Sequence, residues 1–322
     1  TNQNTFLKKT NRRPQRPPRK NKALMHKITV NDITTPMRLD RYLRTIDPNL
    51  SQGLIEKATR QGDIKLNNTK VKTSDRVSAG DIILTNDYFT INQGPRKQEH
   101  FDAAIVALAD KIINIYKLYE DDNILVINKP SGLATQGGSN ISLSIDHALK
   151  YLNTKDYDLR LVHRLDRETS GVLVLAKSRE AATIIGSALE QRIITKKYLA
   201  ITHGALKSEK GMISSYLSKI HDKIYEVSKN DKDAKLAQTE YQLLKSKDDI
   251  HLIEFTPHTG RMHQIRCHAA YSLKTPIVGD KKYGSMIDHN NLCLHAASIL
   301  IPAAIFGKEI VARAPEPGYF KM

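Results

Sequence analysis

The stretch that decides the fold is HRLDRETSG, residues 163–171, followed by the apolar run VLVLA at 172–176. Asp166 lies between two arginines, and a turn-forming Thr-Ser-Gly follows it. The run behind the turn is apolar enough for a buried strand. Ser178 can then cap a helix over residues 180–191, so packed structure braces the loop. A carboxylate on such a rigidly supported loop is typical of an active site.

The same loop also allows a purely structural interpretation. Aspartate is common in turns, where it caps backbone N–H groups, and arginine often pairs with it. The complete nonapeptide favours function, because HRLDRETSG before an apolar strand resembles the signature of the RluA-like RNA pseudouridine synthases. The resemblance implies that Asp166 is the catalytic carboxylate, that Arg164 helps to flip the target nucleotide and that Arg167 contacts RNA.

A second motif comprises TGRMHQIRCH at residues 259–268 and GDKKYG at 279–284. It resembles the matching motif of the same family. The resemblance implies that Arg266 pairs with the catalytic carboxylate, and that Arg261 and His263 shape the site and contact RNA.

Two shorter segments carry further candidates. A tyrosine in the strand-like run KKYLAI, residues 196–201, is usually a core residue. The family's lysine-x-tyrosine context implies instead that Tyr198 stacks on the base and assists proton removal at C5. A β-branched run, residues 124–128, ends at a Lys-Pro-Ser-Gly turn that resembles the family's entry turn. By that resemblance Lys129 lines the site and contacts RNA, whereas an isolated lysine would simply be exposed.

The sequence predicts neither a metal site nor a cofactor. His258, His263, Cys267 and His268 cluster, but no glutamate accompanies them and no cysteine pair exists, so a zinc site is not expected. Gly137-Gly138 does not form a phosphate-binding loop. Isomerisation of uridine needs neither a redox equivalent nor a phosphate donor.

Composition favours a polyanionic partner. The 322 residues include 50 Lys and Arg against 34 Asp and Glu, a net charge of +16, which suits RNA. We expect no membrane span and no secretory leader, because no apolar run is long enough. Two cysteines without a C-x-x-C pair suit a reducing compartment. We therefore expect a cytoplasmic protein, and a monomer.

Four segments are expected along the chain. Residues 1–27 contain nine Lys or Arg and no acid, which predicts a disordered basic tail. An S4-like RNA-binding domain over 28–89, a linker over 90–118 and the catalytic domain over 119–322 follow.

The S4 expectation rests on RLDRYLR, QGDIKLNNTKV and AGDIIL, which together resemble an S4 RNA-binding domain. Residues 28–88 contain nine basic and eight acidic residues, so RNA binding requires segregated charges. The alternative is a small α/β module with ordinary solvated faces. The cations expected to share the RNA-binding surface are Arg38, Arg41, Arg44, Lys57 and Arg60.

Short strand-like runs in close succession over residues 212–256 predict an antiparallel sheet. We therefore predict an α+β protein with a mixed, largely antiparallel sheet flanked by helices. The expected function is pseudouridine formation in large-subunit (23S) ribosomal RNA or its assembly intermediates. The alternatives are a synthase for transfer RNA or another ribosomal RNA, a non-catalytic RNA-binding ribosome-assembly protein, and an RNA hydrolase using Asp166 with His163 or His263. Attack at C1′ of the ribose or C6 of the base stays open.

Overall fold

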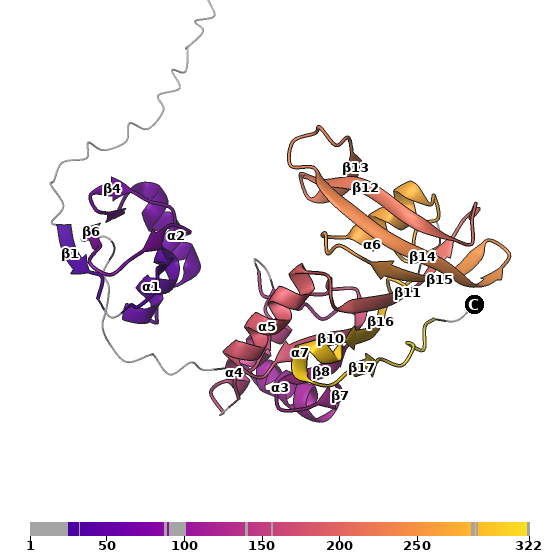
Figure 1. Ribbon diagram of the computed structural model, residues 1–322, viewed down its shortest axis with the longest axis horizontal. Coiled ribbons are helices and arrows are strands. Elements are labelled where there is room, and N and C mark those ends of the chain that lie inside the picture. Colours follow the sequence, from indigo (N-terminus) through magenta and orange to yellow (C-terminus); the bar gives the residue numbers. More distant parts are fainter. Residues whose placement is uncertain are drawn as a thin grey trace, which may run out of the picture. The chain divides into compact units, whose positions relative to one another are not determined.

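The computed structural model describes residues 25–31, 33–86, 89, 101–138, 141–155, 157–284, 287 and 289–320. The chain divides after His100 into two compact units, each with its own hydrophobic core (Figure 1). The predicted basic tail up to residue 24, and residues 90–100 of the predicted linker, lie outside the described residues.

The first unit combines two helices with a four-stranded antiparallel sheet of order β1-β6-β3-β4 and a β2–β5 pair, within its described residues. Both ends of α2 (Gln52–Gln61) are capped: the Ser51 hydroxyl accepts the Leu54 N–H, and Gly62 ends the helix with φ +80°. The elements are β1 (Met25–Thr29), β2 (Met37–Arg38), α1 (Leu39–Ile46), α2 (Gln52–Gln61), β3 (Ile64–Leu66), β4 (Thr69–Lys70), β5 (Arg76–Val77) and β6 (Ile82–Asn86).

The second unit is built on one large sheet of order β13-β12-β14-β15-β11-β16-β10-β8-β7, with β17 on β16 and β9 on β10. Among the described strands, β10 and β16 alone pair in parallel, which confirms the predicted mixed, largely antiparallel sheet. The elements are α3 (Ala103–Asn114), β7 (Lys117–Glu120), β8 (Ile124–Lys129), α4 (Ile145–Leu152), β9 (Arg160–Leu161), β10 (Ser170–Ala176), α5 (Arg179–Glu190), β11 (Thr195–His203), β12 (Lys210–Ile220), β13 (Lys223–Val227), β14 (Lys235–Lys247), β15 (Ile250–Pro257), α6 (Gln264–Cys267), a π-helical turn (His268–Ser272), β16 (Leu294–Ile301), α7 (Ala303–Phe306) and β17 (Ile310–Arg313).

The predicted linker is too long at its carboxyl end. Residues 103–114 form α3, and β7 begins at Lys117. Leu108, Ala109 and Ile112 are buried on one side of α3, in the same core as α4. Apolar residues at helical spacing give this segment a face to bury, so it belongs to the second unit.

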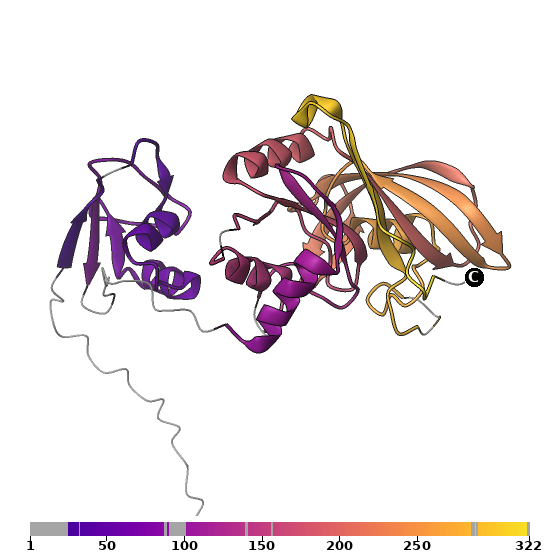
Figure 2. The same ribbon diagram turned by 90° about the horizontal axis from the view of Figure 1, so that it is seen from below.

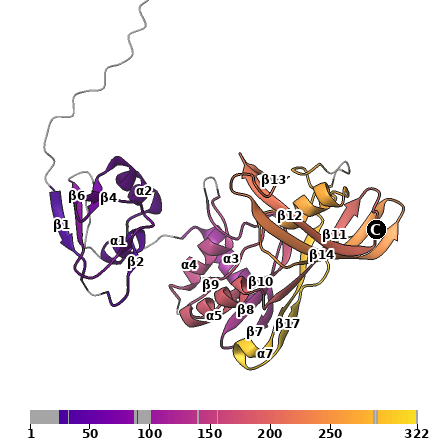
Figure 3. The same ribbon diagram turned by 45° about the horizontal axis from the view of Figure 1, so that its top comes forward.

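Strand β10 is buried along its whole length, and helices cover both of its faces. Val172 and Val174 pack in the core that contains α5, whereas Leu173 and Leu175 pack on the opposite side with α3 and α4. Alternation along a strand sends successive side chains to opposite faces. Figures 2 and 3 show these helices gathered at the β7–β10 end of the sheet, with β12–β15 extending away at the other end.

The two parts of the sheet meet at a short seam. Only Ser170 with His295 and Gly171 with Ala296 pair between β10 and β16. Gly171 has φ +108°, and a Cβ there would lie 2.2 Å from the Ala296 carbonyl oxygen. Glycine is therefore required where the loop of residues 163–169 enters β10. No helix in the described part of the chain is long and apolar enough to cross a membrane.

Candidate active site

The Lys-Pro-Ser-Gly turn after β8 anchors the loop of residues 163–169 through backbone hydrogen bonds. The Gly132 N–H donates to the Arg167 carbonyl at 2.9 Å, and the Ser131 hydroxyl donates to the Glu168 carbonyl at 2.7 Å. Thr135 binds both the N–H and the carbonyl of Leu165. The loop is thus attached to β8 and the segment after it at several consecutive residues.

Lys129 takes part in this anchoring and does not line the cavity that contains Asp166, whereas the resemblance implies that it lines the site. Its side chain is fully buried, and Nζ donates to the carbonyls of Pro130, Leu133 and Arg167 at 2.9, 2.7 and 3.1 Å. Burial lowers the pKa of Lys129 to about 7, against the opposing pull of Glu168 and Asp166. The lysine is therefore a structural support of the loop.

Asp166 faces a cavity of about 430 Å³. One carboxylate oxygen, Oδ2, lies 3.7 Å from Nε2 of His263 and 3.8 Å from Nη1 of Arg266. Both distances exceed hydrogen-bond length. Among the described residues no donor hydrogen-bonds the side chain, which keeps 21% of its surface exposed. The carboxylate is consequently available to a bound molecule.

Arg266 lies beside Asp166 as expected, but its close partner is a different carboxylate. Nε and Nη2 of Arg266 donate to the two oxygens of Asp280 at 2.8 and 2.7 Å, and both side chains are buried. This bidentate pair fixes the guanidinium and leaves Nη1 directed at Asp166. The expected pairing of Arg266 with Asp166 therefore holds only as a longer ion pair.

His263 is oriented by Tyr283. The Tyr283 hydroxyl accepts the Ile224 N–H at 3.1 Å and lies 2.8 Å from Nδ1 of His263. In the tautomer with its proton on Nε2, His263 accepts the Tyr283 hydroxyl proton at Nδ1 and presents Nε2–H towards Asp166. Burial lowers the pKa of His263 although Asp166 opposes this, so the neutral form is favoured.

Tyr198 lines the same cavity from β11, next to a β-bulge between Lys197 and Tyr198. Burial, and then the charge of Asp166, raise the pKa of the Tyr198 phenol. The phenol stays protonated, so the position suits stacking on a base better than removal of a proton. Asp166, Tyr198 and Arg266, predicted to act together, line one cavity.

Arg164, Arg167 and Arg261 lie around the cavity in different ways. Arg164 and Arg167 are exposed, and their side chains donate to Gln136 at 3.2 Å and to the Gly132 carbonyl at 3.0 Å. Arg164 and Arg261 line the cavity; Arg167 does not. Nε of Arg261 donates to the Leu236 carbonyl at 3.0 Å.

His163 has a structural role. Its Nε2 accepts the Val174 N–H at 2.9 Å, and burial, followed by the nearby charge of Lys196, lowers the pKa of His163 to about 3. A ring held neutral by its hydrogen bond to β10 is poorly suited to act as the general base of a hydrolase.

Two members of the histidine and cysteine cluster, Cys267 and His268, are buried in the core. Cys267 is buried with its thiol 3.6 Å from the Ile224 carbonyl, and His268 hydrogen-bonds Thr239 and Ser215. In the described part of the chain no three potential ligands gather into a metal site.

The predicted S4 cations all lie in the first unit and are exposed. Arg38 pairs with Asp40 at 2.8 Å, and Arg44 donates to Gln52 at 2.9 Å. The side chains of Arg41, Lys57 and Arg60 have no ion pair among the described residues.

Comparison with known proteins defines the class of this site. A family model described as RNA pseudouridylate synthase matches residues 123–271. The solved structure of human RNA pseudouridylate synthase domain containing 4 superposes with a TM-score of 0.57 and 30% identity, covering 67% of this chain and 94% of that one. Human RNA pseudouridylate synthase domain containing 1 gives a TM-score of 0.53 and 26% identity, over 64% and 85%. The chain belongs to the RNA pseudouridine synthase family.

Relatives that match nearly the whole chain carry more specific names. A protein of Rickettsia typhi named ribosomal large subunit pseudouridine synthase C is 45% identical over 296 residues, 90% of this chain and 97% of that protein. A protein of the same name from Vibrio vulnificus is 31% identical over 284 residues, 85% and 88% of the two chains. The similarity therefore spans both units.

Proposed function

We propose that this enzyme converts uridines of large-subunit (23S) ribosomal RNA, or of its assembly intermediates, into pseudouridine. The observation that carries the proposal is the carboxylate of Asp166, which accepts no hydrogen bond from the described residues, in a cavity that Tyr198 and Arg266 also line. The names of the full-length relatives support the ribosomal substrate.

The reaction breaks the bond between N1 of uracil and C1′ of ribose, turns the base and joins C5 to C1′. The proton lost from C5 is balanced by one gained at N1, so nothing is added overall. Asp166 is the proposed nucleophile, at C1′ or at C6. Nη1 of Arg266 stabilises its charge, His263 presents Nε2–H beside it, and Tyr198 stacks on the flipped base.

The decisive experiment is tritium release from RNA labelled at C5 of uridine, comparing the wild type with Asp166→Asn. Asparagine keeps the shape and removes the nucleophile, so turnover should fall by about 10⁴-fold or more while RNA stays bound. Wild-type protein that releases no tritium from any RNA would refute the enzyme. Tritium release from transfer RNA alone would show that transfer RNA is the substrate. An active Asp166→Asn variant would show that Asp166 is not the nucleophile.

The remaining assignments follow from the same substrate. We assign the first unit to RNA binding as an S4-like domain, through the exposed cations Arg38, Arg41, Arg44, Lys57 and Arg60. In the second unit, Arg164 helps to flip the nucleotide, and Arg167 and Arg261 contact the RNA. We place the reaction in the cytoplasm, and assign a monomer because one unit supplies all the proposed catalytic groups.

A further inference from the structure

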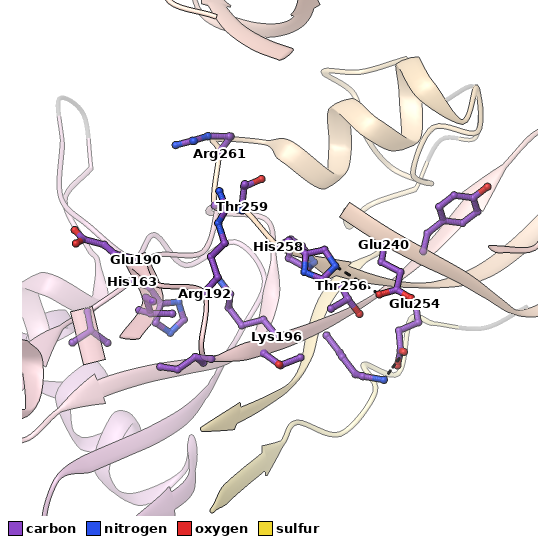
Figure 4. A pocket seen from close by; sticks show the side chains of 18 of the residues that line it. His163, Glu190, Arg192, Lys196, Glu240, Glu254, Thr256, His258, Thr259 and Arg261 are labelled. Atoms are coloured by element: carbon purple, nitrogen blue, oxygen red, sulfur yellow. Dashed lines mark hydrogen bonds and ion pairs between the residues drawn. The ribbon is translucent and has the colours of Figure 1, made fainter. Parts of the chain in front are cut away.

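A second and larger cavity adjoins the one that contains Asp166. It measures about 780 Å³ and lies between the loop before β11 and strands β14 and β15 (Figure 4). The residues that line both cavities are His163, Lys196, Pro257, Thr259, Gly260 and Arg261. The two cavities are therefore parts of one continuous hollow, and the proposed chemistry uses only the smaller part.

At the far end of the larger cavity, each acid has a basic residue close to it. Lys197 pairs with Glu254 at 2.7 Å, and Nε2 of His258 lies 3.7 Å from Glu240. Figure 4 shows both acids on the side away from His163. This end presents little net charge to a ligand.

Three further cations line the larger cavity: Arg192, Lys196 and Arg261. None of the three has a carboxylate partner among the described residues, and Lys196 and Arg261 also line the cavity of Asp166. Figure 4 shows Arg192 and Lys196 between His163 and the His258–Glu240 pair. Glu190 is the one lining acid outside the pairs already named. The net charge of these side chains is positive.

Lys196 is the most informative of these cations. Its side chain is partly buried and lines both cavities, and burial lowers the pKa of Lys196. A charge withdrawn from water without a counter-ion is costly. An anion bound at the shared wall would supply the missing partner.

We propose that the larger cavity binds the backbone phosphate of a nucleotide next to the target uridine, with Lys196 as its main contact and Arg192 beside it. The inference rests on the proposed function: a flipped base in the smaller cavity remains joined to the RNA through its ribose. The neighbouring phosphates then lie at the opening of that cavity, where the larger one begins.

Lys196→Met tests this assignment, because methionine keeps the length of the side chain and removes the charge. The probe is an unmodified transcript of large-subunit ribosomal RNA, with the dissociation constant measured across a series of salt concentrations. Loss of one charge-assisted contact should weaken binding by roughly ten-fold or more at low salt. The slope of log affinity against log salt should become shallower by about 0.7.

Two control variants isolate the contact. Lys196→Arg keeps the charge and should keep the salt slope. Lys245→Met removes one charge from an exposed position on β14, outside both cavities, and should bind as the wild type does. Should Lys196→Met fail to fold, Arg192→Gln gives the same test at an exposed residue. The slope of log affinity against log salt should then become shallower by about 0.7.

The phosphate itself can be located with short RNAs around a uridine that the wild type modifies. A neutral methylphosphonate at the contacted position should weaken the wild type and leave Lys196→Met unaffected. Suppose that folded Lys196→Met binds RNA with the affinity and salt slope of the wild type, while the wild type releases tritium. This result would overturn the phosphate subsite and leave the proposed function standing. A lower turnover with unchanged affinity would also overturn the subsite, whereas a wild type without tritium release would remove the proposed function as well.

Discussion

Tyr283 contacts three parts of the site, two through its hydroxyl group and one through its ring. It accepts from Ile224 on β13, is hydrogen-bonded to His263, and its ring lies under the Arg266 guanidinium at 5.1 Å. Its own pKa is raised, chiefly by burial, so the group stays a neutral donor. Tyr283 is thus a positioning residue for both groups beside Asp166.

Tyr283→Phe should lower kcat more than it raises KM, since His263 loses the contact that fixes its tautomer. The stability cost should be about 1–3 kcal/mol, because the buried Ile224 N–H loses its acceptor. The tautomer can be followed by nitrogen NMR of labelled histidine. Tyr225→Phe, at a neighbouring tyrosine, is the matched control. A kcat equal to that of the wild type would remove the positioning role.

At the residue scale the sequence predicts which groups gather but not how they pair. Asp166, Tyr198 and Arg266 come from distant segments and line one cavity, as the motifs indicate. The close partner of Arg266 was missed, although Asp280 stands in the quoted GDKKYG motif. A buried arginine needs a carboxylate, but spacing alone does not distinguish two candidates.

At the scale of elements, the seam between β10 and β16 depends on Gly171. Gly171→Ala would place a methyl group 2.2 Å from the Ala296 carbonyl oxygen at a φ that alanine rarely adopts. We expect a loss of about 3 kcal/mol or more in the free energy of unfolding, measured in urea. Gly186→Ala on α5 has open space around the new methyl group and should stabilise by roughly 0.5–1 kcal/mol. Equal stability of Gly171→Ala and the wild type would contradict the close approach.

His163, which holds β10, makes stability depend on pH. Burial and Lys196 lower its pKa to about 3, from an unfolded value of about 6.5. Between these values only the unfolded chain binds the proton, so the free energy of unfolding falls as pH falls. The loss attributable to this residue should reach roughly 3 kcal/mol by pH 4.5.

The measurement is urea unfolding from pH 7 to pH 4 for the wild type and His163→Gln. Glutamine does not titrate, so the stability gap between the two proteins should narrow as pH falls. His221→Gln, at an exposed turn, should run parallel to the wild type. A constant gap for His163→Gln would show that His163 is not the titrating group.

Most elements follow from local patterns, because strand alternation and helix caps act over a few residues. The predicted strands over residues 212–256 correspond to β12, β13, β14 and β15. The order of strands does not follow, since β16 lies between β10 and β11 through contacts that no local pattern encodes. The predicted linker includes the residues of helix α3, because they directly follow a polar, proline-containing stretch.

At the scale of the whole molecule, our proposal assigns RNA affinity to the first unit and the chemistry to the second. Removal of residues 1–100 should leave turnover of a short, saturating RNA measurable while weakening binding to the full target. Replacing Arg41, Lys57 and Arg60 together by glutamine should make the salt slope shallower by roughly two. An unchanged salt slope in both variants would remove the RNA-binding assignment of the first unit.

The position of β16 in the sheet bears on how the enzyme is made. Synthesis runs from the amino end, so the ribosome completes the first unit and Asp166 well before Arg266, and β16 comes last of these. Until β16 emerges, β10, which follows the loop of Asp166, and β11, which carries Tyr198, lack the strand that lies between them in the sheet. If the first unit binds RNA as proposed, we expect a product truncated before residue 294 to bind RNA without turnover.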